Sequence, residues 1–269
     1  MFSVLISVYR KDDPVYFSEA LGSLVRQLQY IREVVMVKDG PIGAELEAVI
    51  ASYRDALPIR EVPLPQNVGL ARALNAGLAH CRSEWVFRFD ADDLCLPGRA
   101  ALQWAAISCG ALDIVGGQIQ ECDPATLAVT GVRKVPCQPA DIRRFLRRRN
   151  PFNHMTVCYR KSFIERIGGY PDIPLKEDYA LWAKAVAAGA RVANMPDVVV
   201  RARAGRDMVT RRGGIGYAKS EIALQWFLRK NGIKSTLASL ADGLARAMVF
   251  VAPVSLRHIV FRRYLRQSA

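Results

Sequence analysis

The chain is 269 residues long, 51% hydrophobic and 23% charged, so it can bury a sizeable core and is neither disordered nor of low complexity. Its net charge is +13, but the charge is unevenly distributed. Residues 1–130 hold 11 basic and 16 acidic side chains, whereas residues 131–190 hold 12 basic and 5 acidic ones and residues 191–269 hold 15 basic and 4 acidic ones. This asymmetry indicates an anionic partner for the second half, such as phosphate, nucleic acid or a membrane surface, although a solvated basic surface explains it equally well.

Strand and helix patterns alternate along the first hundred residues. Apolar runs predict buried strands at 3–9, 34–37, 59–62 and 85–89. Apolar residues at helical spacing predict helices at 14–28, 44–53 and 69–80. This alternation is typical of a mostly parallel sheet with helices on both faces. Ligands of such sheets bind beyond the carboxyl ends of the strands, so the informative residues should directly follow each strand.

The most acidic of these strand ends is 90–93, with the sequence Asp-Ala-Asp-Asp. Asp90 and Asp92 flank Ala91, so an extended backbone places both carboxylates on the same side. Hard oxygen ligands at this spacing suit Mg²⁺ or Mn²⁺. A strand-end turn explains the same residues equally well, with Asp93 capping the helix that follows Pro97.

The six cysteines show no metal-binding spacing, because no two of them lie closer than 13 positions. The first residues run directly into an apolar strand without a basic leader. We therefore expect reduced thiols and a cytoplasmic location.

Two segments combine arginines with an apolar stripe. Residues 141–149 predict a basic amphipathic helix with Ile142, Phe145 and Leu146 as its stripe. Residues 237–266 predict a second such element, with Leu244, Met248, Val249, Phe250, Val251 and Val254 as apolar positions. Its uncharged stretch is too short to span a bilayer, so either segment could lie on an anionic lipid surface. The alternative is packing on the protein or on a second subunit.

Five segments together resemble the GT-A-fold glycosyltransferases of family 2. They are SVLISVYRKD at 3–12, VVMVKDG at 34–40, QNVGLARALNAGL at 66–78, FRFDADD at 87–93 and KEDYALWAKA at 176–185. Further segments resemble the bacterial exopolysaccharide branch typified by amylovoran biosynthesis enzymes, namely 113–120, 148–157, 168–170 and 211–214. The resemblance covers nearly the whole chain and weakens after about Asn231.

The resemblance implies an α/β GT-A fold, which is Rossmann-like, with a mixed, mostly parallel sheet flanked by helices. It divides the chain into a catalytic domain at 1–231, with a nucleotide-binding half at 1–95 and an acceptor-side half at 96–231, and a helical extension at 232–269. The implied reaction is metal-dependent and inverting, and it transfers a sugar from a nucleoside diphosphate donor, usually a UDP-sugar. The implied acceptor is a polysaccharide repeat unit on a polyprenyl diphosphate, which would place the protein peripherally on the inner face of the cell membrane.

The family's roles fall on particular residues of this sequence. Residues expected around the donor are Tyr9, Arg10, Asp39, Arg72, Asn75, Asp90, Ala91 and Asp92. Asp39 would accept the imide N–H of uracil, unless it serves only as a turn residue before Gly40. Asp92 and Asp90 would bind Mn²⁺ or Mg²⁺, and Asp93 would bind a donor hydroxyl if it does not cap a helix.

Asp178 would be the general base that activates the acceptor hydroxyl. Its neighbour Glu177 competes for this role, and both could instead simply stabilise a helix start. His154, which precedes a predicted strand at 156–159, would contact the acceptor or diphosphate, unless it is a structural histidine. Arg211 and Arg212 would clamp the diphosphate, unless they are solvated.

Two other classes of protein fit parts of the pattern. A nucleotidyltransferase also combines a nucleotide fold with metal carboxylates, but it usually has a glycine-rich basic loop after the first strand, where this chain has Tyr9–Asp12. A nucleic-acid-binding protein would explain the net charge. The acidic first half and the absence of a known binding motif disfavour nucleic acid as a partner.

Overall fold

A computed structural model of the chain describes residues 1–204, 213–253 and 257. Its helices are α1 (Pro14–Val25), α2 (Ala44–Ser52), α3 (Leu70–His80), α4 (Arg99–Ser108), α5 (Pro139–Leu146), α6 (Lys161–Arg166), α7 (Glu177–Ala187), α9 (Ile215–Lys230) and α10 (Thr236–Val251). Its strands are β1 (Phe2–Val8), β2 (Ile31–Lys38), β3 (Ile59–Pro63), β4 (Trp85–Arg88), β5 (Leu94–Cys95), β6 (Ile114–Cys122), β7 (Val129–Arg133), β8 (Cys158–Arg160) and β9 (Val192–Arg203).

The strands form one sheet in the order β3-β2-β1-β4-β8-β6-β9-β5, and β7 pairs with β6 at its side. Strands β1, β2, β3 and β4 are mutually parallel, as predicted. β8 joins the two halves because it pairs antiparallel with both β4 and β6. The sheet is therefore mixed and mostly parallel, which confirms the predicted GT-A fold class.

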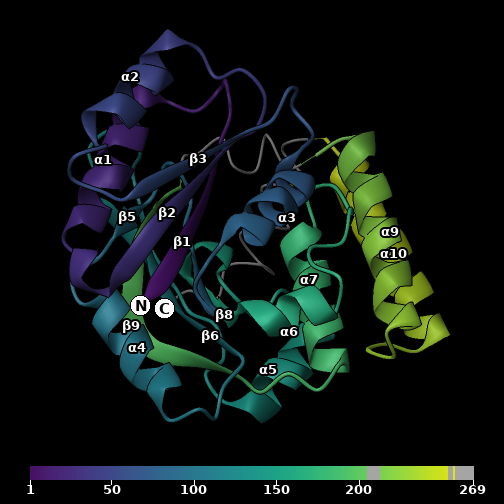
Figure 1. Cartoon of the computed structure of the whole chain (residues 1–269). Coiled ribbons are helices and arrows are strands. Elements are labelled where there is room, and N and C mark those ends of the chain that lie inside the picture. The colour runs from purple at the N-terminus through teal and green to yellow at the C-terminus, as the bar shows by residue number, and fades with distance from the viewer. Residues whose placement is uncertain (205–212, 254–256, 258–269) are drawn as a thin grey trace.

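Helices cover the two faces of the sheet (Figure 1), and an apolar core lies beneath them on each face. The alternation along β1 sends Val4 and Ile6 into the core beneath α1 and α2, and Leu5 into the core beneath α3 and α7. Because both faces are covered, the carboxyl-terminal edge of the parallel strands remains the natural place for a ligand.

The second half departs from the predicted boundaries at one strand. The expected strand at 156–159 lies at Cys158–Arg160, and His154–Thr156 forms a 3₁₀ turn before it. The backbone N–H and hydroxyl of Thr156 both donate to the Asn153 carbonyl, at 2.9 and 2.7 Å, and these bonds close the turn. Local polar bonds therefore override the β-propensity of Thr156.

Each of the two basic amphipathic segments forms a helix, as predicted, within the residues that the structure describes. The first is α5, which begins with Pro139 in its first turn and ends at Leu146. The second is α10, which ends before Pro253. It packs antiparallel on α9, so the expected boundary between residues 231 and 232 falls within the turn of a helical hairpin (Figure 1).

Candidate active site

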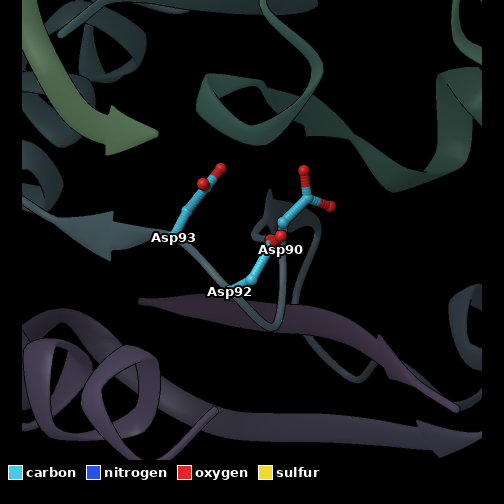
Figure 2. Close-up of side chains that lie close together, drawn as sticks. All are labelled: Asp90, Asp92 and Asp93. Atoms are coloured by element: carbon cyan, nitrogen blue, oxygen red, sulfur yellow. The ribbon is translucent and has the colours of Figure 1, made fainter. Parts of the chain in front are cut away.

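An acidic loop follows β4 at the carboxyl edge of the sheet. Oxygen atoms of Asp90, Asp92 and Asp93 lie within 4.8 Å of one another. Figure 2 shows the three carboxylates on one side of the loop. Asp92 is exposed, Asp90 is half-buried and Asp93 is buried. The loop thus offers a set of hard oxygen atoms, with Asp92 open to an incoming ion.

The electrostatics of this loop favour a bound cation. Although Asp92 as a whole residue is exposed, the surrounding protein desolvates its carboxyl group and raises the pKa of Asp92 to about 6, and the neighbouring Asp90 carboxylate adds to the shift. Burial, together with the carboxylates of Asp92 and Asp90, raises the pKa of Asp93 well above its ordinary value. Carboxylates that resist ionising together are stabilised by a divalent cation, and their oxygens are the ligands that Mg²⁺ and Mn²⁺ prefer. The residues present therefore fit the predicted metal.

Two buried arginines hold the loop in place. The Arg88 side chain is 1% exposed, and it donates to the Phe89 carbonyl and to Asp90 Oδ1. The Arg203 side chain, on β9, is 2% exposed and donates to the Asp92 carbonyl. The Arg203 backbone N–H donates to Asp93 Oδ1 at 3.1 Å.

Asp93 does not cap a helix, which corrects that expectation. Helix α4 begins after Gly98 and has no side-chain cap, and Asp93 instead accepts the Arg203 N–H. Arg203 has no signal in the sequence, since its distance along the chain from the acidic loop hides the contact.

The turn after β1 contributes a further carboxylate. Tyr9 and Arg10 are exposed there, as a ligand contact would require. The Tyr9 N–H donates to Asp12 Oδ2 at 2.9 Å. Burial raises the pKa of Asp12 to about 7, and the carboxylates of Asp92 and Asp90 add to this effect. Asp12 therefore belongs to the same acidic site, although its only sequence signal was its place in the first resembling segment.

Asp39, at the end of β2, organises the loop that precedes α3. Its buried carboxylate accepts the N–H groups of Val68 and Gly69, at 2.7 and 3.2 Å, and the Asn67 side-chain amide at 2.9 Å. A carboxylate has about four acceptor positions, so one remains for a base N–H. Gly40 is required beside it, because a Cβ there would lie 2.7 Å from the Asn67 backbone nitrogen.

Arg72 and Asn75 project from α3 onto the segment that precedes α7. Arg72 forms an exposed ion pair with Asp172, through Nη2 at 2.6 Å. The Asn75 side chain donates to the Tyr170 carbonyl at 2.9 Å and accepts its N–H at 2.8 Å. Both side chains thus support the protein's own backbone, and their contact with a donor stays a prediction.

The first turn of α7 carries Glu177 and Asp178. Asp178 Oδ2 accepts the Asn150 amide at 2.6 Å, and Oδ1 accepts the Tyr179 N–H at 2.7 Å. Burial raises the pKa of Glu177 to about 7, with contributions from Asp178 and, more weakly, from Asp90. The Asp90 carboxylate of the acidic loop is thus close enough to this turn to act on Glu177. Asn150 is a further residue of the site, and its only sequence signal is its place in the resembling segment 148–157.

His154 is held by aromatic side chains behind this turn. Its Nε2 lies 3.0 Å from the Tyr170 hydroxyl, and its ring meets those of Tyr170 and Trp182 edge to face. Burial lowers the pKa of His154 well below its ordinary value, and the Arg88 guanidinium acts in the same direction. These contacts favour the structural alternative for His154. Arg211 and Arg212 lie outside the described residues.

Comparison with known proteins identifies the family and the fold. The profile of "Glycosyl transferase family 2" matches residues 3–168. An uncharacterized glycosyltransferase of Haemophilus influenzae is 42% identical over 99% of both chains. The amylovoran biosynthesis glycosyltransferase AmsE of Erwinia amylovora is 38% identical over 98% of both. An Escherichia coli UDP-Gal:alpha-D-GlcNAc-diphosphoundecaprenol beta-1,3-galactosyltransferase is 35% identical over 99% of this chain and 97% of its own.

Among solved structures, S. aureus TarS 1-349 in complex with UDP-GlcNAc superposes with a TM-score of 0.70. That match covers 99% of this chain and 76% of TarS at 19% identity, so it supports the fold alone.

Proposed function

The chain belongs to glycosyl transferase family 2, and we propose that it transfers a sugar from a UDP-sugar, with inversion, to a polysaccharide repeat unit carried on a polyprenyl diphosphate. One observation carries the proposal. The acidic loop at the carboxyl edge of the sheet lies close enough to the first turn of α7 for the Asp90 carboxylate to contribute to the raised pKa of Glu177, although the two segments lie far apart in the sequence. A site of this kind supplies both a place for a diphosphate with its cation and a carboxylate for the acceptor.

At the donor end, the loop after β2 would hold the base and the acidic loop would hold the diphosphate. Asp39 would accept the uracil imide N–H through its remaining acceptor position, while its other bonds fix the loop. Asp92 and Asp90 would bind Mn²⁺ or Mg²⁺, which neutralises charge on the leaving diphosphate. Arg88 and Arg203 keep these carboxylates in place.

At the acceptor end, Asp178 would take the proton of the attacking hydroxyl. A single inversion needs one base and no covalent intermediate, so one carboxylate within hydrogen-bond reach of the acceptor is enough. The Asn150 amide and the Tyr179 N–H fix both oxygens of Asp178. Glu177 shares the turn, and its raised pKa leaves it partly protonated at neutral pH.

The acceptor proposal rests on the relatives and on charge. One relative's name specifies a diphosphoundecaprenol substrate, and another's specifies amylovoran biosynthesis. The basic second half of this chain suits an anionic membrane surface. Within the described part of the chain, no helix is long and apolar enough to cross a membrane. We therefore propose peripheral association with the inner, cytoplasmic face of the cell membrane. Family membership favours this reaction over nucleotidyl transfer.

A thermal-shift titration tests the donor and the metal together. UDP or a UDP-sugar with Mn²⁺ should raise the Tm, because a ligand that binds only the native state stabilises it by mass action. At 100 times Kd the gain is about 2.7 kcal/mol. GDP and Mn²⁺ alone serve as controls. A chain that responds equally to GDP, or to UDP equally well in EDTA, would contradict the assignment of donor or metal.

A further inference from the structure

The outward face of α10 is apolar along the whole helix. It consists of Leu237, Leu240, Leu244, Met248 and Val251. These side chains are between 54% and 81% exposed and recur at a spacing of three or four residues. On the opposite face, the small residues Ser239 and Gly243 pack on α9, and a Cβ at Gly243 would contact Gln225. The structure therefore buries the less apolar face and leaves the more apolar face to solvent.

This arrangement differs from the stripe expected from sequence. Val249 and Phe250 are half-buried, and the Phe250 ring packs against Tyr217 of α9 at 5.5 Å. Val254 lies outside the described residues. The exposed stripe instead begins near the turn of the hairpin, at Leu237.

The exposed side of α9 adds an aromatic residue with cationic neighbours. Trp226 is 47% exposed, and the guanidinium of Arg229 lies 4.6 Å from its ring. The ammonium of Lys230 lies 6.0 Å from the same ring. Ile222 is exposed one turn earlier. An exposed tryptophan beside cations is typical of a membrane–water interface, where its apolar body and N–H face different media.

The charges of the hairpin are complementary to an anionic surface. Between residues 213 and 253 there are two carboxylates. Glu221 is 1% exposed and pairs with Lys176 and Arg246, and Asp242 pairs with Lys234. Lys219 and Lys230 are exposed on α9. The described hairpin thus offers exposed cations, and both of its carboxylates are already paired with cations.

More cations surround the turn of the hairpin. Arg143, Arg144 and Arg147 of α5 line a shallow cavity of about 590 Å³ together with residues 231–233 of the turn. The Arg147 Nε donates to the Ile233 carbonyl at 3.2 Å, which fixes the arginines next to the turn. The cavity thus borders the turn that leads into α10, whose apolar face begins at Leu237.

We infer that the outward face of α10, with Trp226 and the α5 arginines, is the surface by which the protein lies on an anionic lipid bilayer. The inference rests on the proposed membrane association and names the face responsible. A bilayer is favoured over a second copy because two copies of this face would bring like charges together. A bilayer provides apolar depth for the leucines and phosphates for the arginines at the same time.

Co-sedimentation of the full chain with vesicles tests the surface. We expect binding to phosphatidylglycerol–phosphatidylcholine vesicles at low salt, release at high salt, and weak binding to phosphatidylcholine alone. The double variant Leu240→Glu, Leu244→Glu should bind at least about tenfold more weakly, which is ~1.4 kcal/mol. Val15→Glu on α1, where Val15 is 63% exposed, is the matched control and should bind like wild type.

Arg143→Gln with Arg144→Gln tests the electrostatic part and should weaken binding only to the anionic vesicles. Wild-type affinity in the Leu240–Leu244 variant would overturn the inference. Light scattering that shows a dimer dissociated by that variant would overturn it in favour of self-association. Sugar transfer to a water-soluble acceptor should be unchanged in every variant, so vesicle binding fails or holds independently of the proposed reaction.

Discussion

Replacing Asp178 by asparagine separates catalysis from binding. The substitution keeps the shape of the side chain and removes a group that can accept a proton at neutral pH. Oδ1 can still accept the Tyr179 N–H, but the new amide would meet the Asn150 amide, which now donates to Oδ2 at 2.6 Å. The Asn150 oxygen is already engaged by the Phe152 N–H at 3.2 Å. The fold should therefore lose one hydrogen bond, about 1 kcal/mol.

The expected effect on the reaction is larger. A positioned general base contributes roughly 10²–10⁴ in rate, which corresponds to about 2.7–5.4 kcal/mol of barrier. Transfer from the UDP-sugar should fall by that factor, while the Mn²⁺-dependent affinity for UDP stays within about twofold. Radiolabel transfer under single-turnover conditions measures the first quantity, and calorimetric titration measures the second.

Glu177→Gln is the matched control for Asp178→Asn. Glu177 lies in the same turn, and burial raises its pKa to about 7, so a neutral glutamine resembles one of its native protonation states. Its cost in rate should be less than about tenfold. The reasoning is refuted if Asp178→Asn transfers sugar at a near wild-type rate. If Glu177→Gln is the more damaging variant, the base is Glu177.

Two further perturbations probe the metal site and the helical hairpin. Asp92→Asn removes the exposed charged ligand of the acidic loop. The Mn²⁺-dependent affinity for UDP, measured by calorimetry, should therefore fall by at least about tenfold. An unchanged affinity in a folded variant would contradict the metal assignment. The cations Lys176 and Arg246 hold the pKa of Glu221 below its ordinary value, although burial of the carboxyl group acts in the opposite direction. The ionised Glu221 therefore stabilises the fold above pH ~4.3, and this stabilisation is lost as the pH falls through the pKa of the folded state. Glu221→Gln leaves Lys176 and Arg246 without their buried carboxylate, so it should lower the urea-unfolding free energy by about 1–3 kcal/mol at pH 7. The difference from wild type should shrink as the pH falls below ~4.3, and a difference that grows in acid would reverse the assigned sign.

Local pattern was enough to predict the first half of the fold. β1 to β4 and the helices between them follow from apolar periodicity and turn residues, and their order implies the parallel edge where Asp39 and the acidic loop lie. Each of these signals spans only a few residues, so the sequence displays it directly. The spacing of Asp90 and Asp92 left a metal site and a strand-end turn open, and the metal role assigned to them by the family resemblance stays a prediction.

The residues that support the site could not be predicted in this way. Arg203 reaches the acidic loop from β9, and Asn150 reaches Asp178 across 28 positions. Such contacts depend on β8 inserting antiparallel between β4 and β6, a pairing that local periodicity does not encode. The apolar pattern of α10 was visible, but which of its faces packs on α9 depends on Ser239 and Gly243, whose small size matters only once the partner helix is in place.

The inferred membrane face and the proposed base share the same supports. Lys176 directly precedes α7, and its ammonium lies 2.7 Å from Glu221 of α9, which also binds Arg246 of α10. The Arg246 guanidinium donates in turn to the Arg148 carbonyl, two residues before the asparagine that holds Asp178.

Ionic and hydrogen-bonded contacts therefore tie the hairpin to both segments that position Asp178, and a shift of one should be felt by the other. A hairpin lying on the bilayer would then set the distance of Asp178 from the lipid headgroups. An enzyme whose acceptor sugar is attached through a diphosphate at that level needs its base at a defined height above the membrane. On this proposal, the buried Glu221 would couple the position of the hairpin on the membrane to the position of Asp178.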